Sequence, residues 1–221
     1  YGKLFLNLGV LFIISIFFIF PSLTGAQVQG GITYYVSPTG SDTNSGTDQN
    51  KPLAKIQKAV DLAQPGDTIN LAQGTYLQDI ITRRDATASA PITLTGPSTA
   101  VVSGGGKARI IEINHDYITL TGFTVDGLFG SSESKLGYRD KLIYVLGKQI
   151  RSGVTGLKIT HMTLKNAAGE CIRLRYFAQD NEIAHNTIST CGVLDFRFNG
   201  GGKNGEGVYI GTSPNQLGDG K

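Results

Sequence analysis

Apolar and polar residues alternate over four short stretches that repeat along the chain. The first begins at Ile92 and reads Ile-Thr-Leu-Thr-Gly, and related stretches begin at Ile118, Leu157 and Asn181. Their starts lie 26, 39 and 24 residues apart, with no helical pattern between them. A fixed period of about 20–50 residues indicates a repeat architecture, and alternation with period two indicates strands. The pattern predicts an all-β solenoid of stacked parallel coils.

A second family of apolar stretches follows the first, so each coil is predicted to hold two strands. These stretches are residues 110–113, 142–145, 171–174 and 207–210. Alternation directs every second side chain into the solenoid. The side chains predicted to point inward are Ile111, Ile113, Ile143, Val145, Ile172, Leu174, Val208 and Ile210. Stacking then aligns one outward row of Glu112, Tyr144, Arg173 and Tyr209, and a second of Asn114, Leu146, Arg175 and Gly211.

Two polar segments interrupt the repeats. Residues 127–140 explain the long interval between Ile118 and Leu157, and the glycine-rich residues 199–204 form a second candidate loop. Insertions in solenoids collect on one face, which is often the binding face.

One helix is predicted, over residues 52–64, immediately before the first coil. Apolar residues at Leu53, Ile56, Ala59, Val60 and Ala63 share one of its faces. A solenoid exposes its core at each end and needs a cap there, so we expect this helix to cover the first coil.

The start of the chain has the features of a secretory signal peptide. Lys3 precedes a mostly apolar stretch over residues 4–20, and small residues lead to a preferred cut after Ala26. An uncleaved membrane anchor is the alternative, because this stretch is at the lower limit for spanning a bilayer. The expected organisation is a signal peptide at 1–26, a leader, first strand and capping helix at 27–66, and coils at 67–221, with further coils after a C-terminal truncation.

Composition narrows the classes of partner. The 221 residues include 30 glycines, which suit many tight turns, and the net charge of +3 gives no basic field for nucleic acid. After signal cleavage we expect a secreted monomer with no membrane contact. Cys171 and Cys191 are 20 residues apart, so they can form a disulfide between neighbouring coils or remain two buried thiols.

Residues 34–42, 51–60 and 65–69, followed by Gly74-Thr75-Tyr76, resemble a known opening. It is similar to the start of secreted right-handed parallel β-helix proteins of the pectate lyase type, which include polysaccharide lyase families 9 and 6. The resemblance implies a right-handed parallel β-helix with an N-terminal capping helix. It covers residues 34–76 and concerns the cap, so it is weak for activity.

The resemblance also implies a chemistry, which is β-elimination on an acidic polysaccharide such as pectate with calcium as cofactor. Family 9 enzymes would bring an aspartate cluster that holds calcium and a lysine base. No such aspartate-rich run is present among the later coils. Glu170 and Glu206 occupy equivalent places before their strands, so they form a calcium pair or simply cap two turns.

The outward row supplies the other candidates for a site. Arg173 and Arg175, flanked by Tyr144 and Tyr209, suit an anionic sugar chain, since arginine pairs with carboxylates and tyrosine offers a flat face. Glu112 lies in the same row and offers a surface ion pair as the structural alternative. Arg173 is also a candidate base. His161 and His185 fall at equivalent turn positions, where stacking is favoured over metal binding.

Three functions are compatible with these residues. The first is a secreted, calcium-dependent polysaccharide lyase. The second is a non-catalytic carbohydrate-binding or cell-surface β-helix, which would need the arginine and tyrosine face but no calcium cluster. The third is a glycoside hydrolase or uronate epimerase on the same scaffold, and a hydrolase would need paired carboxylates that the sequence does not display.

Overall fold

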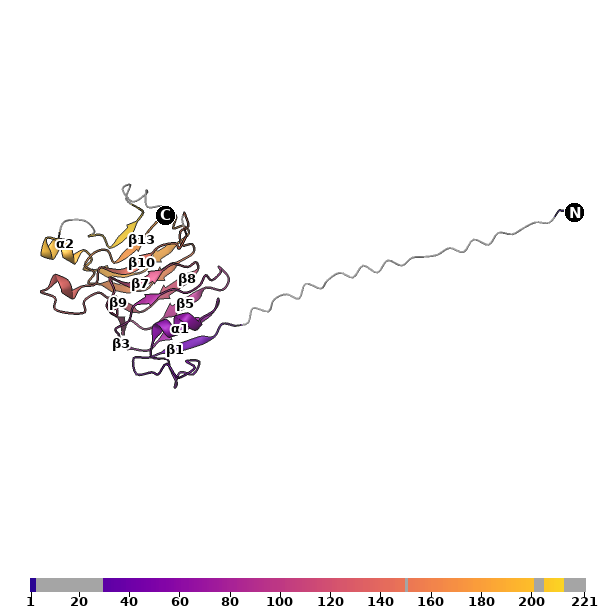
Figure 1. The fold of residues 1–221 in the computed structure, drawn as a ribbon, viewed down its shortest axis with the longest axis horizontal. Coiled ribbons are helices and arrows are strands. Elements are labelled where there is room, and N and C mark those ends of the chain that lie inside the picture. Colours follow the sequence, from indigo (N-terminus) through magenta and orange to yellow (C-terminus); the bar gives the residue numbers. More distant parts are fainter. Residues whose placement is uncertain (3–29, 150, 201–204, 213–221) are drawn as a thin grey trace.

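The chain forms a right-handed parallel β-helix (Figure 1). The structure is a computed structural model and describes residues 1–2, 30–149, 151–200 and 205–212. Its strands assemble into three parallel sheets, here named A, B and C, which the chain visits in that order in every coil. The fold class predicted from the repeats is therefore confirmed.

Sheet A contains the first repeat family. Its order is β1 (Thr33–Val36), β2 (Thr68–Leu71), β5 (Ile92–Thr95), β8 (Ile118–Thr121), β11 (Lys158–Thr160) and β14 (Glu182–Ala184). Ile92 pairs with Ile118, while Lys158 pairs with Thr119 on one side and with Glu182 on the other. The four repeats are thus stacked in the register that the sequence predicted.

Sheet B was not anticipated, because the sequence predicted only two strands per coil. It contains β3 (Gly74–Tyr76), β6 (Ala100–Val102), β9 (Thr124–Asp126), β12 (Thr163–Lys165) and β15 (Thr187–Ser189). Each of its strands has only three residues, too few to show alternation. Gly74 opens the first of them, β3.

One residue with positive φ turns the chain from sheet A to sheet B. It is Gly122 (φ 89°), His161 (φ 57°) or His185 (φ 57°) in successive coils. A left-handed residue bends the chain sharply, and glycine adopts it with least strain. After each turn the sequence repeats a threonine and an apolar residue at 124–125, 163–164 and 187–188, which was the available signal for sheet B.

Sheet C contains the second repeat family. Its order is β4 (Ile80–Ile81), β7 (Arg109–Ile113), β10 (Lys141–Val145), β13 (Ile172–Leu174) and β16 (Val208–Ile210). In Figure 1, β7, β10 and β13 are stacked one above another. These strands present the predicted outward row.

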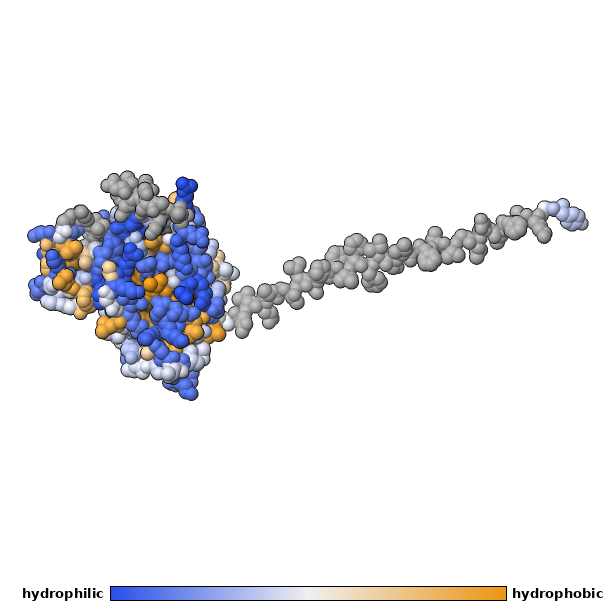
Figure 2. Space-filling model, in the orientation of Figure 1, coloured by the Kyte–Doolittle hydropathy of each residue, from blue (hydrophilic) through white to orange (hydrophobic). Residues whose placement is uncertain are grey.

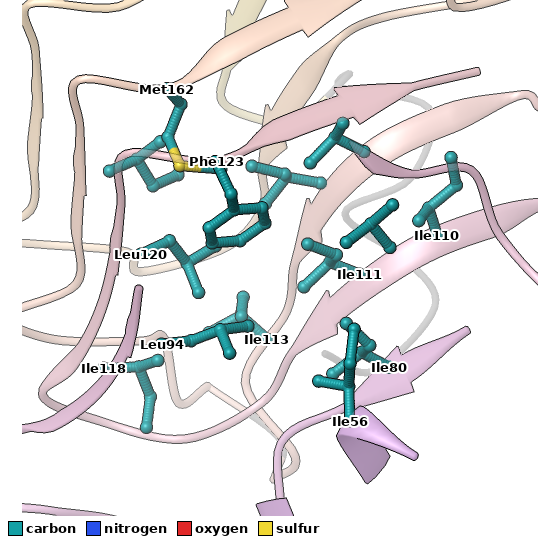
Figure 3. Close-up of a cluster of buried hydrophobic side chains, with 14 of the residues drawn as sticks. Ile56, Ile80, Leu94, Ile110, Ile111, Ile113, Ile118, Leu120, Phe123 and Met162 are labelled. Atoms are coloured by element: carbon teal, nitrogen blue, oxygen red, sulfur yellow. The ribbon is translucent and has the colours of Figure 1, made fainter. Parts of the chain in front are cut away.

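The core fills the space between the sheets with stacked aliphatic side chains (Figure 3). Ile111, Ile143 and Ile172 are fully buried, as alternation predicted, and Phe123 lies beside Leu120 and Met162. Ile210 pairs with the buried Leu174 and so lies on the inward face as predicted, yet it is 71% exposed. β16 is the last strand in the order of sheet C, so no described strand covers the core on its far side.

Helix α1 (Ile56–Leu62) covers the open end of the first coils, burying Ile56 and Ala59. It is shorter than predicted because the preceding residues bond elsewhere. The backbone amides of Ala54 and Lys55 donate to Asp42 Oδ1 at 3.1 and 2.9 Å, and that of Ile56 donates to Gln78 Oε1 at 2.8 Å. Side chains from other segments therefore fix where the helix begins.

Insertions lengthen three of the connections between strands. The sequence analysis assigned the long repeat interval to residues 127–140 alone, which was incomplete. The long repeat interval is shared between residues 127–140, which contain the 3₁₀ helix η1 (Lys135–Gly137), and residues 146–157. A third insertion precedes β16 and contains α2 (Val193–Phe198), which packs near η1. Exposed apolar side chains gather on the insertions that contain η1 and α2, and Figure 2 shows an apolar area near α2.

Some sequence predictions lie outside the described residues. They are the signal peptide over 1–26 apart from its first two residues, residues 201–204 of the second candidate loop, and the C-terminal segment 217–221. Within the described ranges, no helix has the length and apolar character needed to cross a bilayer.

Candidate functional site on sheet C

The outward row of sheet C is assembled by strand register. Tyr144 pairs with Glu112 on one side and with Arg173 on the other, and Arg173 pairs with Tyr209. Four residues spread over almost a hundred positions of sequence thus form one ladder, at about 4.8 Å per strand.

A row of charged residues, which the sequence analysis did not predict, runs beside this ladder. Arg109 pairs with Lys141, and Glu170 lies two positions before Ile172 just as Lys141 lies two positions before Ile143. Simple alternation did not find it, because Ile110 and Ile111 are both fully buried at the start of β7. The available signal was a charged residue three positions before each member of the first row.

Glu170 is the electrostatic centre of the two rows. Its side chain is fully buried, and its two oxygens contact Arg173 Nη1 at 2.6 Å and Lys141 Nζ at 3.2 Å. Lys141 also contacts Asp140 at 2.7 Å. A buried carboxylate requires such partners, since an unpaired charge in the interior is strongly unfavourable.

The proposed calcium pair of Glu170 and Glu206 does not fit this arrangement. Glu170 already has two cationic partners, while Glu206 is exposed. Across the described ranges, no three His, Cys, Asp or Glu side chains come together to hold a metal ion. The described residues therefore do not supply the donor set that calcium needs.

The tyrosines and arginines of the face are packed against one another. The Arg109 guanidinium lies over the Tyr144 ring at 3.6 Å, and Arg175 donates to the Tyr144 hydroxyl at 3.2 Å and to the Tyr176 hydroxyl. Arg173 lies over the Tyr209 ring at 4.6 Å. The sequence had suggested that Tyr144 offers an open ring to a sugar. Tyr144 is buried instead, and it orients the arginines around it.

Arg109 and Glu112 are the accessible charges of the two rows. Their side chains are 37% and 25% exposed, and Arg109 Nη1 lies 3.1 Å from Glu112 Oε2. Glu112 also accepts a hydrogen bond from Asn114 at 3.2 Å. A hollow of about 290 Å³ adjoins them, lined also by Asp79 and Lys107. This part of the face can exchange its internal ion pair for a charged ligand.

The two cysteines form a disulfide, with their Cα atoms 5.5 Å apart. Cys171 adjoins Glu170 at the start of β13, and Cys191 precedes α2. The bond therefore holds the α2 insertion next to the buried charge cluster.

The histidines at the sheet A to sheet B turn stack as expected. The rings of His161 and His185 have centroids 5.1 Å apart and planes inclined by 24°. Both side chains are exposed, and no third ligand accompanies them in the described part of the chain. They are structural turn residues.

Comparison with known proteins settles the family. Residues 34–215 match a family model described as the Pel9A-like right-handed β-helix region. The chain belongs to the Pel9A-like β-helix family. The match covers most of the chain, well beyond the opening that carried the resemblance.

Two curated proteins resemble this Pel9A-like chain. The uncharacterized protein YwoF of Bacillus subtilis is 31% identical over 173 residues, which are 73% of this chain and 35% of YwoF. Pectate lyase PEL9 of Emericella nidulans is 44% identical over 78 residues, 34% of this chain and 17% of that enzyme. The chain thus spans about a third or less of these relatives.

Solved structures show the same fold. Pectate lyase Pel9A superposes with a TM-score of 0.63 at 16% identity, covering 84% of this chain and 46% of that one. An alginate lyase from Paenibacillus gives a TM-score of 0.59 at 24% identity, over 73% and 48% of the two chains. A lacto-N-biosidase from Eubacterium ramulus, a different class of enzyme by name, gives 0.54 at 14% identity over 80% and 40%. At these identities the likeness concerns the fold.

Proposed function

We propose that this chain belongs to a secreted polysaccharide lyase and that its sheet C binds an acidic polysaccharide such as pectate across the two rows. The observation that carries the proposal is the pair of aligned rows, in which three cations, Arg109, Lys141 and Arg173, gather on one face of the β-helix. Guanidinium and ammonium groups bind sugar carboxylates, and arginine does so with two parallel hydrogen bonds. Family membership supports the class of substrate.

The proposed reaction is β-elimination at a uronate. A base removes the proton at C5, a double bond forms between C4 and C5, and the bond between C4 and the glycosidic oxygen breaks. The departing oxygen takes a proton from water or a general acid. The removed proton is weakly acidic because the adjacent carboxylate is negative, so cations that neutralise this carboxylate favour the step. Arg109 is the accessible cation for this task.

Arg173, the base suggested by the sequence, fits substrate orientation better. Its guanidinium already donates to the Glu170 carboxylate at 2.6 Å, so it is held in place by this contact. We therefore propose that Arg173 and Arg175 hold the face rigid and positively charged. Calcium dependence is proposed from the family alone.

The second candidate is a carbohydrate-binding β-helix without catalysis. The observation that favours it is that Arg109, Lys141 and Arg173 each contact a carboxylate already, as they would contact the carboxylates of a bound sugar chain. The two candidates differ only in whether a bond is broken.

The test is incubation of the secreted protein with polygalacturonate, alginate and chondroitin, first with calcium and then with chelator. Elimination creates an unsaturated sugar that absorbs in the ultraviolet. Absorbance that grows with one polymer supports the lyase, and its loss with chelator supports calcium. New reducing ends without absorbance would indicate a hydrolase and contradict the proposal. Binding without either signal would support the second candidate.

A further inference from the structure

A polar pocket lies at the turn from sheet C to sheet A, beside the end of the two rows. It encloses about 220 Å³ and is lined by Asp85, Asn114, Asp116, Lys148, Gln149 and Ser152. Asn114 connects it to the face already described, because its side-chain amide donates to Glu112. The pocket continues the face toward the next turn of the chain.

His115 is buried next to this pocket, between two of its lining residues in sequence, Asn114 and Asp116. Its side chain is 4% exposed, and its Nδ1 lies 2.8 Å from the hydroxyl of the equally buried Thr82. Its Nε2 contacts Lys148 Nζ. An ammonium group can only donate, so Nε2 accepts from Lys148 and the proton of the neutral ring lies on Nδ1, donated to Thr82.

The charges around His115 favour this neutral ring. Burial is the largest effect that lowers the pKa of His115, followed by the charge of Lys148, with Arg83 adding to it. Asp85 and Asp116 act in the opposite direction. The lowered pKa keeps the ring neutral, and so able to accept from Lys148.

Lys148 differs from the other cations of this side of the molecule. Arg109, Lys141 and Arg173 each contact a carboxylate within 3.2 Å. Lys148 makes no ion pair within the part of the chain that the structure describes, and a neutral imidazole positions it instead. Asp85 and Asp116 line the same pocket but make no direct ion pair with Lys148, so the imidazole contact directs its charge.

The rest of the pocket suits hydroxyl groups. Asp116 N–H donates to Asp85 Oδ1 at 3.0 Å and Thr155 N–H donates to Asp116 Oδ1 at 2.8 Å. No described group bonds the second oxygen of either carboxylate, so each can accept from a sugar hydroxyl. The side-chain amides of Asn114 and Gln149 add further polar groups at the rim.

We propose that this pocket is a subsite for one uronate unit of the polysaccharide, with Lys148 binding its carboxylate and His115 acting as the positioning residue for Lys148. The subsite rests on the proposed function, since it extends the same binding face sideways into the connection from sheet C to sheet A. It commits the ligand to a sugar that carries one carboxylate and several free hydroxyls.

The test is the affinity of trigalacturonate and of its methyl ester, measured by calorimetry for the full chain and for Lys148→Gln. We expect Lys148→Gln to bind trigalacturonate about tenfold more weakly, as for the loss of one charge-assisted hydrogen bond. The methyl ester lacks the carboxylate, so its affinity should not change. Equal trigalacturonate affinity in both proteins would overturn the subsite while leaving the proposed function intact.

The positioning role has its own readout. His115→Gln retains an acceptor for Lys148 and should preserve trigalacturonate affinity, whereas His115→Leu should lose as much as Lys148→Gln. The double variant His115→Leu/Lys148→Gln should lose no more than either single variant, because both remove one interaction. Additive losses would overturn the positioning role. A wild-type protein that binds no acidic oligosaccharide would overturn the proposed function and this subsite together.

Discussion

At the scale of single residues, the sheet C face is governed by paired charges in a poorly hydrated setting. Glu170 is the clearest example, because a fully buried carboxylate holds Arg173 and Lys141 together. Removing one member of such a cluster leaves the others without compensation, which is worse than removing the whole cluster.

We expect Glu170→Gln to lower the free energy of unfolding by about 3 kcal/mol, since two cations then face a neutral amide. Urea denaturation measures the change. Glu182→Gln is the matched control, because Glu182 pairs with Lys158 at the surface, where an ion pair contributes at most about 1 kcal/mol. Equal effects of the two substitutions would contradict the role given to Glu170.

His115 predicts a pH dependence of stability. Its pKa is lowered in the folded protein by burial and by Lys148, whereas in the unfolded chain it titrates near its ordinary value of about 6.5. Below about pH 6.5 the unfolded state therefore binds more protons, so stability falls as the pH drops from there through the folded pKa. Above that window His115 has no effect.

The measurement is urea denaturation at several pH values from about 7.5 down to about 5. Wild type should lose more stability over this interval than His115→Gln, because the variant lacks the titrating ring. Carboxylates titrate at lower pH and are common to both proteins. Parallel curves would show that His115 is not held neutral by its surroundings.

At the scale of elements, alternation predicted the strands of sheets A and C down to their register. It succeeded because the four- and five-residue strands there, such as β5, β8 and β7, bury at least two side chains and show the pattern clearly. It failed for sheet B, whose strands have only three residues, and for α1, whose start is fixed by Asp42 and Gln78 from distant segments. Neither effect is visible in a local pattern.

The inward face of sheet C yields a direct test. Ile172→Asp in β13 places a charge in the fully buried core and should reduce the free energy of unfolding by several kcal/mol. Thr163→Asp in β12 is the control, because Thr163 is only partly buried. Thermal unfolding followed by circular dichroism compares the two, and a cooperatively folded, fully stable Ile172→Asp protein would show that the inward assignment is wrong.

The disulfide between Cys171 and Cys191 links the start of β13 to the α2 insertion, and its contribution to stability can be measured. Cys171→Ala/Cys191→Ala should lower the free energy of unfolding by about 3 kcal/mol, because the bond closes a loop whose ends are 20 residues apart. Reductant should destabilise wild type by a similar amount and leave the double variant unchanged. The sequence left bridged and free cysteines equally open, since spacing alone does not place two side chains within bonding distance.

At the scale of the whole molecule, stacking converts a linear repeat into a surface. The row of Glu112, Tyr144, Arg173 and Tyr209 was predictable because the same alternation holds in four successive coils and the strands pair in the same register. Arg109, Lys141 and the Lys148–His115 contact were not, since they depend on how strands begin and how turns fold. The calcium pair of Glu170 and Glu206 was predicted without Lys141, which the sequence did not identify as a partner of Glu170.

The central claim is that sheet C, and no other face, binds an acidic polysaccharide. The most direct measurement compares the affinity for oligogalacturonate of wild type, Arg109→Gln and Lys158→Gln. Both substitutions remove a partly exposed cation that lies 3.1 Å from a carboxylate, one on sheet C and one on sheet A. We predict about tenfold weaker binding for Arg109→Gln and no change for Lys158→Gln. Equal affinities, or a loss only for Lys158→Gln, would contradict the account.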